Sequence, residues 1–436
     1  MKSHPKQPKF LANLLDWPVN RADRTFQVYV VEPGHYEPKN HARIFDAAIN
    51  VFIERRAARV DPYSRDASAA PPLHFDLVTF PEAFLPPERL LDILKNVGRL
   101  DDFGCVHVGL RPSATEPNHL FLASELKALR DELKAVPGLW TADLDSFSGW
   151  LDLQDDKLRF NVGCLFTVDA EQRVRVCLHP KLVQSKYEVS PLPEQNMEEA
   201  NLLTVVTLRP TNKKLKTIIV QPLLCSDALH LATKRTDSRP LEALQSDAEC
   251  LGANPPDHID IVSVPTCTRQ VPGPSSKASY YRTWHNEFKR TFERAASDDA
   301  LARHHFATFV LSNFQMMPEG EPGGLSGAFI PIAVGHAAFP DYVTLSCWGH
   351  PKDTEGNRWS TPDEDCTRGK WSTLGYIASL NPFNGKPEAM ARMFGFTVRQ
   401  LPRDQSSWGS KYGLTDCTLR TGEDQGSPPS LIFATS

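Results

Sequence analysis

Strand-like and helix-like patterns alternate along the first part of the chain. Short runs of β-branched and aromatic residues, bounded by polar or proline-containing stretches, are typical of strands. Longer stretches carry apolar side chains at three- and four-residue spacing, as amphipathic helices do. The pattern predicts strands at residues 25–31, 73–80 and 104–110, and helices at residues 41–60, 90–100 and 123–136. Strands that alternate with helices indicate a layered α/β protein.

The second part of the chain reads as antiparallel structure. Residues 160–168 and 174–178 have the pattern of a hairpin around a turn at residues 169–172. Further strands are predicted at residues 203–208, 217–224, 258–264, 306–312, 323–331 and 342–348, and a helix at residues 279–302. There is no internal repeat and no clean linker. We therefore expect a single elaborated domain over residues 1–436, with a core at about 24–384 and a C-terminal extension at 385–436.

Composition and charge exclude several classes of protein. The chain has 436 residues, of which 41% are hydrophobic and 23% charged, as in ordinary globular proteins. Its net charge is -5 and its basic residues are scattered, so there is no strong nucleic-acid signal. No run of 18 apolar residues predicts a membrane span, and the lysine-containing start lacks an apolar signal segment. We expect a cytoplasmic protein with no membrane partner.

The nine cysteines form no recognisable framework. Their number is odd and no CxxC pair occurs, so reduced thiols in a cytosol fit best. Cys347 and His350 have a metal-like spacing, but no second pair lies nearby in the sequence. We expect neither a metal nor another cofactor.

Two predicted strands deliver reactive side chains where they end. Cys225 follows the strand at 217–224, and Glu82 follows the strand at 73–80 directly after a proline. A cysteine at such a place is more commonly an inert part of the core. A glutamate in apolar company can serve as a general base, however, and a nearby lysine could stabilise an oxyanion. Lys181 and Lys186 are both candidates for that cation.

The order of glutamate, lysine and cysteine on strand exits resembles the nitrilase superfamily of carbon–nitrogen hydrolases. Residues 75–84, FDLVTFPEAF, are similar to the family motif that carries the general base. Many members have a second glutamate eight residues after the lysine, and Glu194 lies eight residues after Lys186, which makes Lys181 the second choice. Around the cysteine the chain departs from the family, because Ser226 replaces an aromatic residue. Asp227 is in place, and no aromatic-proline-glutamate run follows it.

The resemblance implies a fold, a reaction and a set of site residues. The fold would be an α-β-β-α four-layer sandwich with insertions, and the family favours a homodimer or higher oligomer. Cys225 would attack a small amide, nitrile or N-carbamoyl substrate to form a thioester or thioimidate, with Glu82 as base and Lys186 as cation. Glu194 would orient the lysine, the backbone of Ser226 would contribute to the oxyanion hole, and Asp227 would line the pocket.

A second hypothesis places the chain in another class of protein. The altered surroundings of Cys225 and the long segments at 231–257 and 349–370 are compatible with a nitrilase-fold binding or effector module. Such a module would act within a larger multi-component system and have little activity of its own. Turnover of a small amide or nitrile distinguishes the two hypotheses.

Overall fold

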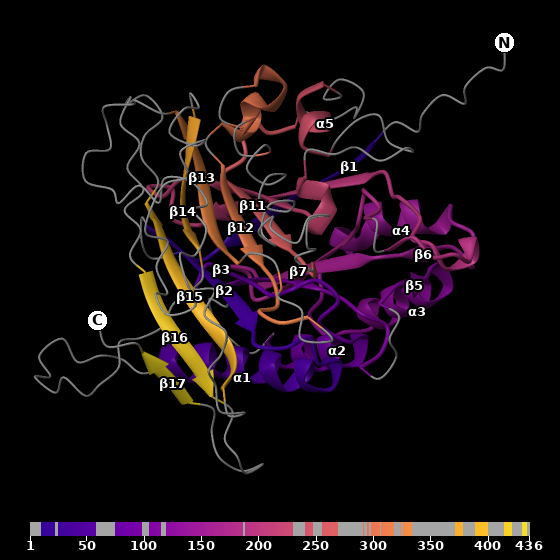
Figure 1. The fold of residues 1–436 in the computed structure, drawn as a ribbon, viewed down its shortest axis with the longest axis horizontal. Coiled ribbons are helices and arrows are strands. Elements are labelled where there is room, and N and C mark those ends of the chain that lie inside the picture. Colours follow the sequence, from indigo (N-terminus) through magenta and orange to yellow (C-terminus); the bar gives the residue numbers. More distant parts are fainter. Residues whose placement is uncertain are drawn as a thin grey trace, which may run out of the picture.

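Two large β-sheets form the centre of the molecule in the computed structural model (Figure 1). The structure describes residues 10–21, 25–57, 75–97, 104–114, 119–185, 188–229, 240–246, 255–268, 291, 294–295, 298–305, 307–317, 323, 326–333, 371–377, 389–399, 414–420 and 430–433. Within these residues the chain has a mixed α/β fold.

The first sheet carries the predicted cysteine strand near its middle. Its strands run in the order β1-β9-β10-β11-β12-β13-β14. Strands β10, β11 and β12 are parallel neighbours, whereas β10 and β9 form an antiparallel pair. The bounds are β1 (Leu11–Val19), β9 (Leu202–Pro210), β10 (Ile218–Pro222), β11 (Ile261–Pro265), β12 (Thr308–Ser312), β13 (Gly327–Ala333) and β14 (Trp371–Ile377).

The second sheet carries the predicted glutamate strand. Its order is β17-β16-β15-β2-β3-β4-β7-β8, and β2, β3 and β4 are parallel. The bounds are β17 (Ser430–Phe433), β16 (Leu414–Arg420), β15 (Ala389–Arg399), β2 (Thr25–Pro33), β3 (Leu77–Thr79), β4 (Cys105–Gly109), β7 (Val162–Val168) and β8 (Val174–Pro180). A separate short pair consists of β5 (Phe121–Leu122) and β6 (Arg159–Phe160).

The two sheets face each other across an apolar layer. Side chains from both sheets meet there, including Val28 and Leu165 from one and Val206, Val220 and Ile261 from the other. These strands are apolar almost throughout, as expected for strands that are buried on both faces. The carboxyl ends of β3 and β8 from one sheet, and of β10 and β11 from the other, lie at one common edge of this layer.

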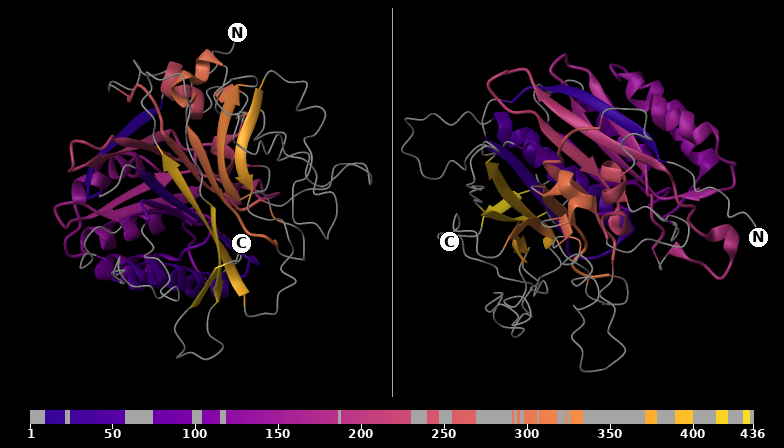
Figure 2. Two further views of the ribbon diagram at one scale, coloured as in Figure 1. Left: turned by 90° about the vertical axis from the view of Figure 1, so that its left-hand side faces the viewer. Right: turned by 90° about the horizontal axis from the view of Figure 1, so that it is seen from above.

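Helices lie on the outer sides of the sheets. Figure 2 shows α1 and α2 beyond the eight-stranded sheet and α5 beyond the other. Their apolar faces are buried, as Leu90, Leu94 and Leu126 illustrate. The helix bounds are α1 (Pro38–Ala57), α2 (Pro87–Val97), α3 (Ala123–Lys134), α4 (Asp145–Asp152) and α5 (Pro240–Ser246). The short 3-10 turns are η1 (Thr141–Leu144), η3 (Pro193–Gln195), η4 (Cys225–Ala228) and η5 (Asp299–His304).

Most predicted elements are confirmed, with bounds that shift by a few residues. The hairpin is present as β7 and β8, which pair from Val162 to Pro180. Strand β1 was not predicted, because its exposed and buried positions do not alternate regularly and Pro18 interrupts the pattern. The predicted strand at 342–348, the polar loop at 349–370 and most of the helix at 279–302 lie outside the described residues.

The region after residue 385 contributes to the main body of the fold. Strand β15 pairs with β2 over nine positions, from Thr25 with Arg399 to Pro33 with Ala391, and β16 and β17 continue the sheet. The sequence pattern set residues 385–436 apart as an extension, whereas three strands from this region extend the eight-stranded sheet.

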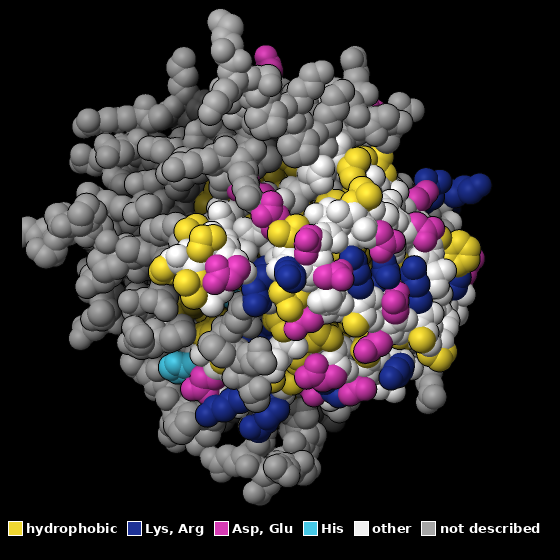
Figure 3. All heavy atoms as spheres, turned by 90° about the vertical axis from the view of Figure 1, so that its right-hand side faces the viewer, with side chains coloured by type: hydrophobic (Ala, Val, Ile, Leu, Met, Phe, Trp, Pro, Cys, Tyr) yellow, Lys and Arg dark blue, Asp and Glu magenta, His cyan; other side chains and the backbone are white. Residues whose placement is uncertain are grey.

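The surface that Figure 3 shows carries both signs of charge side by side. Ion pairs among the described residues join Lys127 with Asp156 and Arg130 with Asp152. A face with interspersed charges of this kind offers no continuous positive field for a phosphate backbone. Among the described helices, none combines the length and the apolar composition needed to cross a membrane.

Candidate functional site

Glu82 lies just beyond β3, where the chain turns sharply. Its side chain is only 3% exposed, and Phe80, Phe84 and Leu85 around it are fully buried. The turn packs against β4, since the Gly109 amide donates to the Pro81 carbonyl at 3.0 Å. A Cβ atom at Gly109 would lie 2.4 Å from the Glu82 Cα, so only glycine permits this close approach. The sequence thus places a buried carboxylate at the common edge of the two sheets.

Lys181 follows β8 directly and extends toward Glu82. Its ammonium donates to Glu82 Oε1 and to Glu188 Oε1, each at 2.8 Å. The amide of Asn161 donates to the same two oxygens, at 2.8 and 2.9 Å. All four side chains are at most 5% exposed. Two carboxylates thus hold one buried lysine, and Asn161 fixes the position of both.

Cys225 begins the 3-10 turn η4 at the end of β10. Its φ is 44°, a left-handed conformation that is uncommon for a residue with a side chain and is often found at functional sites. The turn is tied to the lysine segment by Asp227, whose Oδ1 accepts the Leu182 and Val183 amides at 2.9 and 2.7 Å. Its Oδ2 accepts the Leu224 amide at 3.0 Å. Asp227 therefore sets the position of the cysteine relative to the lysine.

Ser226 strengthens the same connection. Its hydroxyl donates to the Val183 carbonyl at 2.5 Å. Both side chains that follow Cys225 therefore bind the backbone after Lys181. This arrangement leaves them with a positioning role, whereas the sequence analysis had placed Asp227 at the pocket wall.

The backbone of Cys267, just after β11, closes the site from the first sheet. Its amide donates to Glu82 Oε2 at 3.1 Å, and the Glu82 amide donates to the Thr266 carbonyl at 3.3 Å. The amide of Cys267 thus fixes the second carboxylate oxygen of Glu82 from the cysteine-bearing sheet.

Burial and the charges of the site together set the pKa of the Cys225 thiol. Burial raises the pKa of the Cys225 thiol well above its ordinary value, Glu82 adds to the rise, and Lys181 opposes it. Burial works against the charge of Lys181 as well, but Glu188, Glu82 and Cys225 outweigh it and raise the pKa of the lysine. Burial also opposes ionisation of Glu188, yet Lys181 and His119 bring its pKa well below the usual range. A thiol, an ammonium and a carboxylate therefore lie together.

The structure brings together only part of the predicted site. Glu82 and Cys225 lie with Lys181, the second choice of the sequence analysis, while Lys186 is outside the described residues. Glu194 lies in η3 and is exposed, so it does not hold the buried lysine. Lys181 is held instead by Glu188, seven residues after it, whose Oε2 accepts the Ser185 amide at 2.8 Å.

Sequence reasoning missed Asn161, Glu188 and Cys267. Asn161 is a polar residue inside an otherwise apolar strand segment, at the junction of β6 and β7, and it is fully buried. A lone polar residue in such a run is a usable signal, since a buried amide must find partners. The Cys267 contact uses a backbone amide, for which no side-chain pattern exists.

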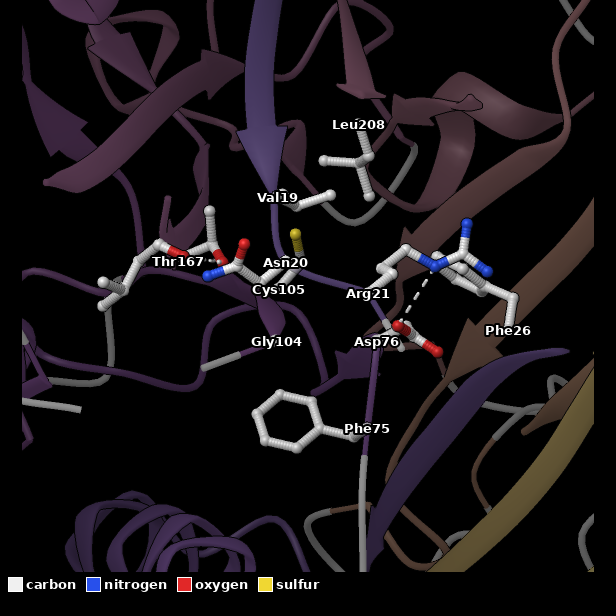
Figure 4. A pocket seen from close by; sticks show the side chains of 11 residues that line it. Val19, Asn20, Arg21, Phe26, Phe75, Asp76, Gly104, Cys105, Thr167 and Leu208 are labelled. Carbon is white, nitrogen blue, oxygen red and sulfur yellow. Dashed lines mark hydrogen bonds and ion pairs between the residues drawn. The ribbon is translucent and has the colours of Figure 1, made fainter. Parts of the chain in front are cut away.

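A small cavity lies at the end of the apolar layer opposite the candidate site. Figure 4 shows it between Val19, Phe26, Phe75 and Leu208, with the ion pair of Arg21 and Asp76 beside it. Its volume of about 20 Å³ has room for roughly one water molecule, which is too small for a substrate. Cys105 on its wall is inert, because burial raises the pKa of its thiol to about 12.

Comparison with known proteins adds no family. No protein-family model matches the chain, and no curated protein matches it. Within the described residues, no group of three or more His, Cys, Asp or Glu side chains is arranged to hold a metal ion. Cys347 and His350 lie outside those residues. The geometry of Glu82, Lys181 and Cys225 is therefore the feature of the described residues that bears on function.

Proposed function

We propose that this chain is a nitrilase-like hydrolase that cleaves a non-peptide C–N bond through a covalent adduct on Cys225. The single observation that carries the proposal is that Lys181 contacts Glu82 at 2.8 Å beside Cys225, at the carboxyl ends of strands from two facing sheets. The two facing sheets with outer helices support a four-layer α-β-β-α sandwich of the nitrilase kind.

The first half-reaction begins from the protonated thiol. Glu82 takes the Sγ proton of Cys225 as the sulfur forms a bond to the carbonyl carbon of an amide. The negative charge that develops on the carbonyl oxygen is stabilised by the Lys181 ammonium and by the backbone N–H of Ser226. Glu82 then gives the proton to the nitrogen, the C–N bond breaks, the amine leaves, and a thioester remains on Cys225.

The second half-reaction returns the enzyme to its starting state. Glu82 takes a proton from water, whose oxygen attacks the thioester carbon. The C–S bond then breaks, the carboxylic acid leaves, and the proton returns to the Cys225 sulfur. The burial of Cys225, which raises the pKa of its thiol, supports this order of steps. A thiol that is protonated at rest needs a base within the site to remove its proton.

An intact-mass experiment tests the proposal. The protein is incubated with a panel of small amides, nitriles and N-carbamoyl compounds, quenched in acid, and the modified peptide is mapped. We expect an acyl or imidate adduct on Cys225 and release of ammonia or amine. Cys225→Ala should form no adduct, whereas Cys164→Ala, which removes a buried thiol from β7, should still do so.

The alternative function, a binding or effector module with little turnover, gives the opposite result. If wild-type protein forms no adduct and releases no amine with any compound of the panel, the hydrolase proposal fails. Retained binding of a panel compound without turnover would then favour the module.

A further inference from the structure

A chain of buried hydrogen bonds runs through the apolar layer directly beneath the candidate site. Thr79 Oγ1 and Ser263 Oγ are 2.8 Å apart, and Ser263 Oγ lies 2.7 Å from His107 Nδ1. His107 Nε2 then meets His179 Nε2 at 2.9 Å. Each of the four side chains is at most 2% exposed. Polar groups buried this deeply are costly unless they bond one another, as these do.

Each member of this chain lies on a strand that leads into the site. Thr79 ends β3, three residues before Glu82, and His179 lies in β8, two residues before Lys181. His107 is two residues before Gly109, which packs against the Glu82 Cα. Thr79, His107 and His179, all from the eight-stranded sheet, therefore lie beneath the side chains of Glu82 and Lys181.

Ser263 comes from the opposite sheet, the one that carries the cysteine. It lies in β11, four residues before Cys267, and its carbonyl accepts the amide of Leu223 at 2.9 Å, two residues before Cys225. Its hydroxyl contacts both Thr79 and His107. Ser263 is thus the point at which the hydrogen-bond chain crosses from one sheet to the other.

We propose that Thr79, His107, His179 and Ser263 form a positioning network that sets the cysteine-bearing sheet in register with the sheet that carries Glu82 and Lys181. The inference rests on the proposed function, since it concerns the geometry of that site. Apolar side chains pack without direction, so they tolerate small displacements of one sheet against the other, whereas hydrogen bonds of fixed length and angle do not.

The hydrogen-bond directions along the chain are consistent with this role. If Ser263 donates to His107 Nδ1, His107 Nε2–H donates to His179 Nε2, and Thr79 donates to Ser263. The reverse direction satisfies every contact equally well. In both, each ring is neutral, because burial lowers the pKa of His107 well below its ordinary value and that of His179 to about 3. The network thus keeps its bonds with no charge buried in the layer.

The shape of the site makes room for this network. A Cβ atom at Gly163 on β7 would lie 2.4 Å from His179 Nε2 and 3.2 Å from Leu224 Cδ2. The missing side chain therefore lets the His179 ring and the residue before Cys225 approach the same point from opposite sheets. Gly163 therefore packs against both His179 and the residue before Cys225.

Ser263→Ala tests the network, and Ser312→Ala is its matched control. Ser312 is also fully buried, lies on the neighbouring strand β12, and also bonds across the layer, to the Val31 carbonyl at 2.6 Å. The kcat and KM for the best compound of the panel are measured for both variants, with the melting temperature and the pH profile of Cys225 alkylation by iodoacetamide. Ser263→Thr, which restores a hydroxyl, is measured alongside.

We expect Ser263→Ala to lower kcat about ten- to a hundredfold with little change in KM, since a misplacement of about 1 Å has effects of this size. The pH profile of Cys225 alkylation should shift in Ser263→Ala. Ser312→Ala should lose similar thermal stability but keep the wild-type kcat and alkylation profile. Ser263→Thr should recover part of kcat. Equal losses in both alanine variants, or an unchanged kcat in Ser263→Ala, would overturn the proposal.

Two further measurements keep the result interpretable. Should Ser263→Ala fail to fold, Thr79→Val removes the terminal hydroxyl with little change of volume, and the same loss of kcat is expected. If wild-type protein forms no Cys225 adduct, the proposed function itself has failed. If wild-type protein turns over and Ser263→Ala equals it, only the network has failed.

Discussion

Lys181 links the charged and reactive side chains of the proposed site. Its ammonium contacts Glu82 and Glu188 at 2.8 Å each, and its charge acts on the Cys225 thiol. Because it is 1% exposed, no bulk water can replace it. Removal of such a cation leaves two buried carboxylates facing each other, which is unfavourable for the fold as well as for the reaction.

We expect Lys181→Met to lower kcat about 100- to 1,000-fold, the usual cost of losing one group that stabilises an oxyanion. Lys186→Ala should keep most of the activity, because Lys181 supplies the cation. The measurement is turnover of the best compound from the adduct panel. Glu194→Gln is the second control, and it should behave as wild type because Glu194 is exposed. The reverse ranking of the two lysines would contradict the geometric assignment.

At the scale of elements, α1 is joined to the site through His41. The His41 ring stacks on Phe84, just after Glu82, with centroids 4.6 Å apart, and on Phe314, just after β12, at 5.1 Å. Burial, together with the nearby Arg111, lowers the pKa of His41 to about 3. The helix therefore packs through a neutral imidazole.

This packing predicts a dependence of stability on pH. The folded-state pKa of His41 lies below the ordinary 6.5. As the pH falls, His41 of the unfolded chain therefore binds a proton before His41 of the folded protein does. The stabilisation is complete above about pH 6.5 and is lost as the pH falls toward 3. His41→Phe should reduce the slope of unfolding free energy against pH by about 1.4 kcal/mol per unit in this window. Urea unfolding between pH 4.5 and 7 measures it, and parallel curves would show that the folded protein accepts the proton.

At the scale of the whole molecule, strands from the early and the last parts of the described chain meet in one sheet. Strand β2 lies between β3, which leads to Glu82, and β15. The outer edge of β2 is therefore paired by residues 389–399. Without β15, nine residues of β2 would expose unpaired backbone groups, which invites association with other chains.

We therefore expect a chain that ends at residue 388 to melt at a lower temperature and to aggregate. A chain that ends at residue 433 keeps β15, β16 and β17 and serves as the control. Size-exclusion chromatography and thermal unfolding compare the two. A monomeric shorter chain with an unchanged melting temperature would show that the pairing with β15 contributes little.

The sequence by itself determined the local features of this protein. Consecutive residues show a buried strand that ends before Pro81 and Glu82, and an apolar strand that ends before Cys225. The hairpin of β7 and β8 follows from alternating residues around a turn. These patterns need only neighbouring residues. They were sufficient to indicate a layered α/β protein with reactive side chains at its strand ends.

Only the tertiary structure decided which residues meet at the site. Lys181 and Glu82 are 99 positions apart, and Asn161 and Glu82 are 79 apart, so no local pattern relates them. A count of eight residues from lysine to glutamate favoured Lys186 and Glu194, but in the structure Glu188 bonds both Ser185 and Lys181. Spacing along a chain specifies proximity only within regular elements, and between them the path of the backbone decides it.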